Sequence, residues 1–185
     1  METSITWLGR LVNSPGGAEW QRLSDVYEPL IAGWVTRAGV AIADRDDLVQ
    51  EVLMVVVRKV GEFEHQHPGA FRAWLRAILA NQLKKYFREN ARLTCLIPLD
   101  SICDPSCEES HIYDREHDEY LAARAMRIIE HEFEPATWRA FRLQVIDDRR
   151  PVDVAAVTGL SLNAVIKAKC RVVKRLRDAL SMLVD

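Results

Sequence analysis

The stretch "PVDVAAVTGLSLNAVIKAKCRVVKRLRDAL" (residues 151–180) has the spacing of a helix-turn-helix. Pro151 suits the first turn of a short helix, and the small side chain of Ala155 lets a second helix cross it. Gly159 follows where the chain must turn and a positive φ is favourable. Val165 lies further along, where it can pack back on the first helix. These offsets predict two crossing helices joined by a tight turn.

The second helix of this unit carries the polar side chains that a DNA groove requires. In a helix-turn-helix, the first turns of the second helix enter the major groove. Ser161 is also a good N-cap for that helix. The residues expected at base edges or phosphates are Ser161, Asn163, Ala164, Lys167, Arg171, Lys174 and Arg175. A helical hairpin with a solvated basic side is the alternative, and the coincidence of charge and groove-facing side favours DNA binding.

Charge is unevenly distributed along a chain whose net charge is only −2. Residues 72–92 hold six basic side chains against Glu89, and residues 161–180 hold six more against Asp178. Between them, residues 100–119 hold eight acidic side chains and only Arg115 among Lys and Arg. Two basic surfaces separated by an acidic segment indicate a polyanion that is contacted at two places.

Almost every stretch of the 185 residues repeats its apolar side chains at helical period. We therefore predict an all-α protein with two small helical domains joined by a flexible linker. The first domain covers residues 1–92, an acidic linker covers 93–113, and the helix-turn-helix domain covers 114–185. The linker is assigned because it contains two prolines and no steady period. Helices are expected to resume near Asp114.

The segment "DRDDLVQEVLMVVVRK" (residues 44–59) predicts a helix with an ordered outer side. Asp44 is its expected N-cap, and most of its valines share the inner side. A strand is the competing interpretation, since valine favours strands, but helical spacing on both sides favours a helix. The outward ridge consists of Asp47, Gln50, Glu51, Met54 and Arg58. From the segment alone, a solvated outer side is the simpler explanation.

Several classes of protein are disfavoured. No apolar run is long enough to span a bilayer, and the amino terminus lacks the pattern of a secretory signal, so we expect a cytoplasmic protein without membrane contact. No nucleophile with a neighbouring base and no phosphate-binding glycine loop stands out, so we expect no enzyme and no cofactor. Cys103, Cys107 and His111, with Cys95 upstream, fit no common zinc module, so no metal is expected.

Taken together, the chain resembles the sigma-70 family of bacterial transcription initiation factors, and specifically its small extracytoplasmic-function class. Four segments carry the resemblance: "YEPLIAGWVTRAGV", "DRDDLVQEVLMVVVRK", "FRAWLRAILANQLKKYFREN" and "PVDVAAVTGLSLNAVIKAKCRVVKRLRDAL". With the "PATWRAF" helix they cover most of residues 22–181. Their order matches a plan of region 2, a linker and region 4, without the middle domain of larger sigma factors.

The resemblance implies a partner for the ridge of residues 44–59. It implies that this ridge docks on the clamp helices of the largest subunit of core RNA polymerase. It also implies that region 4 contacts the flap of the second-largest subunit. Many members of the class are held inactive by an anti-sigma factor, which adds a further expected partner.

The resemblance also implies promoter DNA as a ligand at two elements. The loop 61–70 would capture a flipped base of the −10 element, which requires a pocket and a positive wall. The expected −10 contacts are Phe63, His65, Asn81, Lys84, Lys85 and Arg88, with Gln66 and His67 as further pocket candidates. Trp74, Tyr86 and Phe87 are expected in the core instead. The helix-turn-helix would read the −35 element, although Ile166, Lys167 and Cys170 depart from the family pattern, which leaves the recognised bases open.

Two other functions are compatible with the residues. The chain could be a stand-alone helix-turn-helix regulator that binds duplex DNA as a dimer and needs no polymerase. It could also be an interaction protein whose basic faces bind acidic partners. Dependence of transcription on the chain, its oligomeric state and the salt dependence of its DNA binding separate the three.

Overall fold

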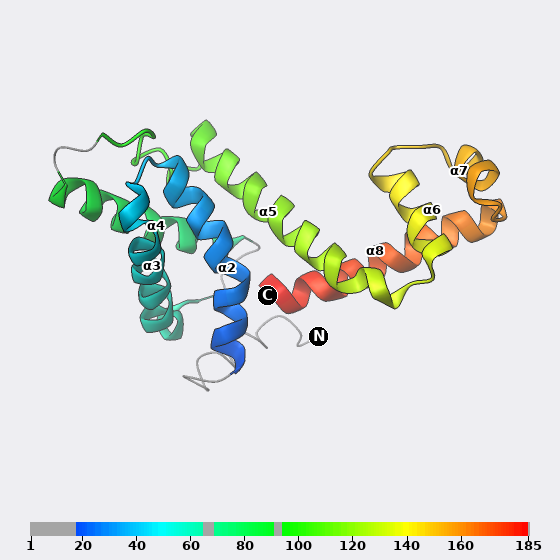
Figure 1. Cartoon of the computed structure of the whole chain (residues 1–185), viewed down its shortest axis with the longest axis horizontal. Helices are drawn as coiled ribbons and strands as arrows, with labels where there is room; N and C mark the ends of the chain where they lie inside the picture. Colours follow the sequence, from blue (N-terminus) through cyan, green and yellow to red (C-terminus); the bar gives the residue numbers. More distant parts are fainter. Residues whose placement is uncertain (1–17, 65–68, 91–93, 185) are drawn as a thin grey trace. The chain divides into compact units, whose positions relative to one another are not determined.

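The structure is a computed structural model, and it describes residues 18–64, 69–90 and 94–184. Figure 1 shows its helices in chain order. The described residues are helical or irregular and contain no strand, which confirms the predicted all-α class. The chain divides into two compact units, one reaching to Tyr120 and the other covering Leu121–Val184. Helix α5 (Glu108–Ile129) contributes its first half to one unit and its second half to the other.

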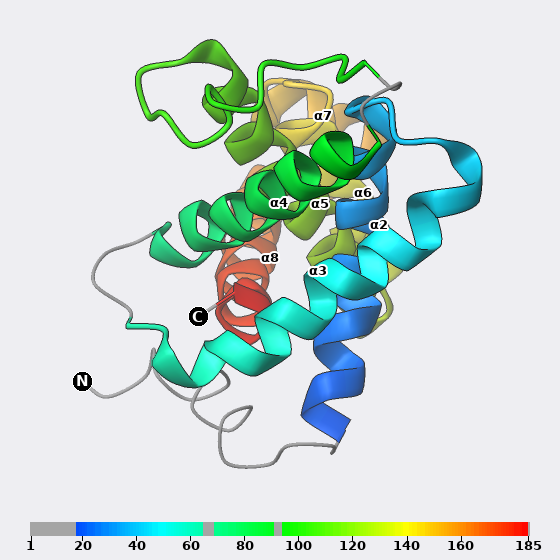
Figure 2. The same ribbon diagram turned by 90° about the vertical axis from the view of Figure 1, so that its left-hand side faces the viewer.

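The first unit is built around α2 (Ala18–Arg37), α3 (Arg45–Lys59) and α4 (Ala70–Glu89). Two short 3-10 turns, η1 (Ile42–Asp44) and η2 (Val60–Glu62), flank α3. Helix α3 contacts both α2 and α4, as Figure 2 also shows. The core consists of the apolar sides of these helices, including Tyr27, Ile31, Trp34, Val52, Val56, Phe71, Leu75, Leu79 and Leu83.

The ends of α2 and α3 follow the sequence in part. Helix α2 runs through Pro29 and ends at Arg37, where Gly39 adopts a φ of 85° as expected of a helix stop. Asp44 precedes α3 but makes no side-chain capping bond, contrary to prediction. Its carboxylate instead accepts a hydrogen bond of 2.7 Å from the Tyr86 hydroxyl, because α4 passes within reach. Asp44 therefore ties α4 to the start of α3.

The segment before α5 differs from the predicted linker. Helix α5 begins at Glu108, six residues before the expected Asp114. Ile102 is fully buried, and the Leu96 amide donates to the Ala38 carbonyl at 3.0 Å. The predicted linker 93–113 thus contributes a buried side chain and the first turn of α5 to the first unit. Its scattered apolar residues hid this role, since they have no period of their own.

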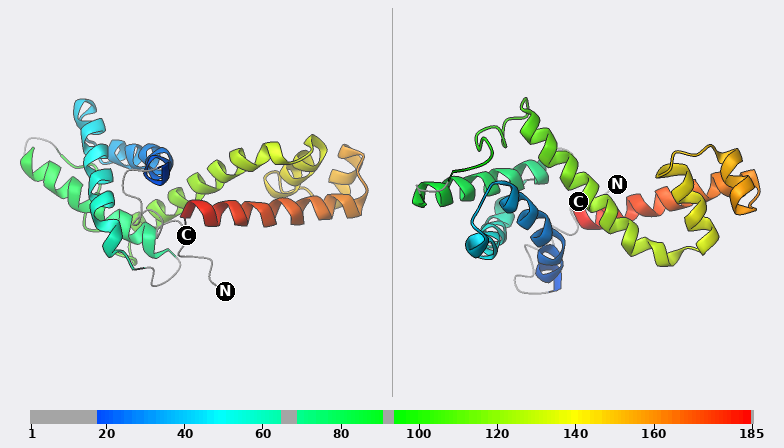
Figure 3. Two further views of the ribbon diagram at one scale, coloured as in Figure 1. Left: turned by 90° about the horizontal axis from the view of Figure 1, so that it is seen from below. Right: turned by 45° about the horizontal axis from the view of Figure 1, so that its top comes forward.

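The second unit contains the end of α5, η3 (Glu130–Glu132), α6 (Pro135–Val145), α7 (Pro151–Thr158) and α8 (Leu162–Val184). Helices α6, α7 and α8 contact one another in pairs, and Figure 3 shows α6 and α7 beside the first turns of α8. Among the helices that the structure describes, none alone is long and apolar enough to cross a membrane, and the bent pair α7–α8 meets that test only when taken together.

Candidate nucleic-acid and protein interfaces

The ridge of α3 lies on the surface of the first unit. Asp47, Gln50, Met54 and Arg58 are exposed, and the Met54 side chain keeps 53% of its accessible surface. Glu51 is half-buried, because its carboxylate lies 3.4 Å from the Lys85 ammonium of α4. Behind the ridge, the valines of the inner side pack into the core. The ridge is therefore available to a partner, and its docking role stays a prediction.

Phe63 is the part of the predicted base pocket that the structure describes. Its ring packs edge-on against Phe71, with 5.6 Å between centroids, and tilts against Trp74 at 5.2 Å. His65, Gln66 and His67 lie outside the described residues. Phe63 is half-buried in this aromatic cluster, and part of its surface is exposed.

The predicted −10 contacts on α4 differ in availability. Asn81 and Arg88 are exposed. Lys84 forms an ion pair of 2.7 Å with Asp100, and this hydrogen bond is the main cause that raises the pKa of Lys84 and lowers the pKa of Asp100. Lys85 pairs with Glu51 of the α3 ridge. Both lysines are on the surface, where such pairs are weak and open readily, so both remain candidates for phosphate contacts.

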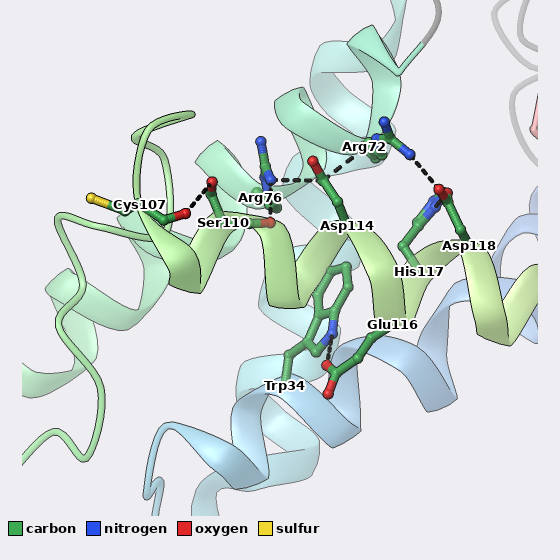
Figure 4. A network of polar contacts seen from close by, with 9 residues as sticks. All are labelled: Trp34, Arg72, Arg76, Cys107, Ser110, Asp114, Glu116, His117 and Asp118. Carbon is green, nitrogen blue, oxygen red and sulfur yellow. Dashed lines mark hydrogen bonds and ion pairs between the residues drawn. The ribbon is translucent and has the colours of Figure 1, made fainter.

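Two arginines of α4 are held by α5, which the sequence did not predict (Figure 4). One Arg76 nitrogen donates to the Ser110 carbonyl at 2.7 Å and to the Asp114 carboxylate at 2.6 Å. Arg72 lies 2.6 Å from Asp118 and 3.5 Å from Asp114. Arg76 is only 5% exposed, so these contacts place a charged side chain inside the first unit.

The same stretch of α5 also binds α2. The Trp34 indole donates to Glu116 at 3.1 Å, and Arg37 forms an ion pair with the same carboxylate. Tyr113 packs edge-on against Trp34 with 5.1 Å between centroids, and its burial raises the pKa of its hydroxyl to about 12. We call the α5 residues Ser110–Asp118, with their partners on α2 and α4, the α5 seam.

The helix-turn-helix predicted from the sequence is present as α7 and α8. Pro151 opens α7, and Gly159 ends it with a φ of 72°. The Ser161 hydroxyl accepts the Ala164 amide at 3.2 Å, as expected of an N-cap. Val165 is fully buried and packs in a cluster with residues of α6, α7 and α8.

A buried amide joins α6 to α8 beneath this cluster. Gln144 is only 6% exposed, and its amide nitrogen donates to the carbonyls of Ala140 and Val165, each at 2.9 Å. The first carbonyl belongs to its own helix and the second to α8. Gln144 therefore fixes how the proposed recognition helix sits on its support. Its polarity in an otherwise apolar setting was the signal in the sequence.

The side chains predicted for the −35 element lie mostly on the surface of α8. Asn163, Lys167, Arg171 and Lys174 are exposed. Arg175 differs, because it makes a two-pronged ion pair with Glu132, in which both N–O distances are 2.6 Å. This pair holds Arg175 against η3, so it is the least available of the predicted −35 residues.

A hollow of about 730 Å³ lies between η3 and α6 in the second unit. Its lining includes Phe133, Trp138, Arg142 and Leu143. The Trp138 ring is 8% exposed, and its buried indole N–H has no hydrogen-bond partner. The hollow thus combines aromatic surface with charged edges, a composition that suits a protein segment.

All four cysteines are free thiols: Cys95, Cys103, Cys107 and Cys170. Burial is the main cause that raises the pKa of Cys107. Across residues 18–64, 69–90 and 94–184, no three His, Cys, Asp or Glu side chains gather as metal ligands.

Comparison with known proteins identifies the first unit. Residues 23–93 match the family model of sigma-70 region 2. No curated protein matches the chain significantly. Among solved structures, the chain is similar to that of CnrH in complex with the cytosolic domain of CnrY, at 21% identity over 100% of this chain and 98% of that chain. The TM-score of this match is 0.39.

Proposed function

We propose that the chain is a member of the sigma-70 family of transcription initiation factors, of its extracytoplasmic-function class, and that it directs core RNA polymerase to specific promoters. One observation carries this proposal: a region 2 match over residues 23–93 and a helix-turn-helix at α7–α8 occur in the same chain. The polymerase subunits would perform the nucleotide chemistry, and this chain would supply promoter specificity.

The docking surface that we propose is the α3 ridge. Its exposed carboxylate, amide and thioether groups suit a helical partner with basic side chains, while Met54 adds an adaptable apolar contact. Asp47 and Gln50 are the better test positions, because Glu51 is already engaged with Lys85. Reversing the charge at Asp47 should repel the partner without disturbing the core.

Promoter reading is assigned to two surfaces. Asn81, Lys84, Lys85 and Arg88 of α4, with the loop beyond Phe63, would bind the −10 strand. The exposed residues of α8 would enter the major groove at the −35 element, with Asn163 and Lys167 nearest the bases. Arg171 and Lys174 would contact phosphates.

The hollow beside Trp138 is the proposed site for a second polymerase contact. A segment of the flap of the second-largest subunit would cover its aromatic surface. An anti-sigma factor would compete for such polymerase-binding surfaces, which is how members of this class are held inactive.

Run-off transcription with purified core polymerase tests the function. Transcription from promoters selected by the reconstituted holoenzyme should require this chain. The variants Asp47→Arg and Gln50→Arg should abolish association with core, whereas Asp46→Arg, with the same charge change in the same helical turn, should retain it. Normal association of both ridge variants would overturn the docking assignment. A dimer that binds duplex DNA tightly without core would favour the stand-alone regulator.

A further inference from the structure

Two arginines one turn apart on α4 face two aspartates one turn apart on α5. Residues four positions apart on a helix lie on the same side, about 6 Å apart along its axis. Arg72 and Arg76 have this spacing, and so do Asp114 and Asp118. The N–O distances of 2.6 Å show that each arginine is bound by a carboxylate of α5. Figure 4 shows the resulting ladder of charges.

The arginine pair lies on a different side of α4 from the later basic residues, and Arg76 is only 5% exposed. Lys84, Lys85 and Arg88 follow it on the same helix, and Lys84 is likewise paired with an acidic residue, Asp100. Residues 100–118 therefore place carboxylates against three basic side chains of α4. Carboxylate and phosphate oxygens are alternative acceptors for the same guanidinium fork.

The α5 seam is incompletely satisfied. The buried Arg76 Nε, the Tyr113 hydroxyl and the His117 Nε2 all lack a hydrogen-bond partner. Each of these buried groups is less favourable without a partner than it would be in water. Release of α5 would hydrate all three groups, and this hydration offsets part of the free energy needed to expose the apolar side chains of the seam. The α5 seam therefore needs less free energy to open than an interface of the same size whose buried polar groups all have hydrogen-bond partners.

We propose that Arg72 and Arg76 form a second strand-binding site on α4, and that Asp114 and Asp118 of α5 occupy it until a DNA strand displaces them. The choice of a DNA strand as the ligand rests on the proposed function. The α5 seam then acts as an internal competitor, which lowers the affinity of the free chain for single strands. Opening of the seam makes both arginines available for two further phosphate contacts.

Binding of the full chain to labelled single-stranded oligodeoxythymidine, measured against salt, tests the competition. The variant Asp114→Asn/Asp118→Asn should bind about fivefold more tightly than the control Glu108→Gln/Glu119→Gln, because the strand no longer displaces two ionised carboxylates from the arginines. The log–log salt slopes of these two chains should be similar, because the strand contacts both arginines in each complex. Addition of Arg72→Gln/Arg76→Gln to the aspartate variant should lower its slope by about 1.4, since each single-strand phosphate contributes about 0.7. Equal affinities of the aspartate variant and the control, or a slope that the arginine substitutions leave unchanged, would overturn the proposal.

Hydrogen exchange of the unaltered chain tests displacement without any substitution. Saturating oligodeoxythymidine should speed amide exchange in residues 110–118 of α5, while α8 serves as an internal reference. Unchanged or slower exchange in 110–118 at saturation would overturn the proposal. Run-off transcription remains the separate test of the proposed function, so a chain that fails there but loses α5 protection on strand binding would refute only the function.

Discussion

Gln144 offers the sharpest test of how the helix-turn-helix is supported. Its two hydrogen bonds contribute about 0.5–1.5 kcal/mol each after exchange with water is counted. Methionine has a similar length and no donor, and it gains some apolar burial, so Gln144→Met should destabilise the α6–α8 contact by about 1–2 kcal/mol. The Val165 carbonyl lies inside α8 and retains its helical acceptor role, so the variant leaves no new orphan there.

Glutamate at position 144 should behave differently, because its negative charge would be repelled by the carbonyl oxygens around it. A carboxylate would face the carbonyl oxygens of Ala140 and Val165, neither of which can donate. A buried and uncompensated charge costs about 3–5 kcal/mol. Burial raises the folded-state pKa of such a carboxyl above its unfolded value of about 4.3. Stability of Gln144→Glu should therefore be retained below that pH and be lost as pH rises through the folded-state pKa.

Hydrogen exchange of α6 and α8 amides in the full chain measures both effects. Gln144→Met should speed exchange roughly 5–30-fold, which corresponds to the expected loss of about 1–2 kcal/mol. Arg139→Met, an exposed substitution on the same helix, should change exchange little. The reasoning would be refuted if Gln144→Glu matched Gln144→Met at every pH, because the amide would then not be the donor in the native contact.

Three further outcomes are expected. His117 is buried against Tyr27, and this burial is the main cause that lowers the pKa of His117 below the ordinary 6.5, while its bond to Asp118 opposes the shift. The stability that the neutral imidazole contributes is therefore complete above pH 6.5 and is lost as pH falls toward the folded-state pKa. His117→Phe should flatten the pH dependence of amide exchange in residues 110–118. Gly159→Ala should lower the thermal stability of the α7–α8 unit by about 1 kcal/mol because of the positive φ, whereas Gly159→Asn should cost less, as differential scanning calorimetry would show. Lys174→Gln should reduce the log–log salt slope of duplex binding by about 0.9. Arg175→Gln should reduce that slope less, because Glu132 already binds the Arg175 guanidinium, and equal reductions for the two variants would contradict this expectation.

The helices and the helix-turn-helix could be predicted from the sequence because their signals are local. The period of apolar residues indicated the buried sides of α3 and α4, and Gly159 and Ser161 marked the turn between α7 and α8. The predicted surface residues of α3 and α8 are largely exposed for the same reason, since a helix fixes which side chains share a side. The ion pair of Arg175 could not be predicted in this way, because its partner Glu132 lies far away in the sequence.

The α5 seam could not be predicted because its signals are distant from one another. In the sequence, Asp114 and Asp118 cannot be distinguished from the other charges of the acidic segment. Only the fold shows that they lie opposite Arg72 and Arg76 of α4. Asp44 misled for a related reason: its position suits an N-cap, but Tyr86 competes for the carboxylate. For Asp44, a local capping role and a tertiary partner were both available, and the tertiary partner was used.

The basic–acidic–basic order of the chain therefore has a different physical meaning from a simple tether between two DNA-binding surfaces. Acidic residues 100, 114 and 118 pair with three basic side chains of the first basic segment within its own unit. In the second segment, Asn163, Lys167, Arg171 and Lys174 are open to solvent. Under the proposed function, duplex DNA would bind α8 without displacing the acidic residues, whereas a single strand at Arg72 and Arg76 would compete with carboxylates already in place. Because that competition would cost free energy only at the first surface, we expect strand capture to depend on other contacts that hold the DNA nearby.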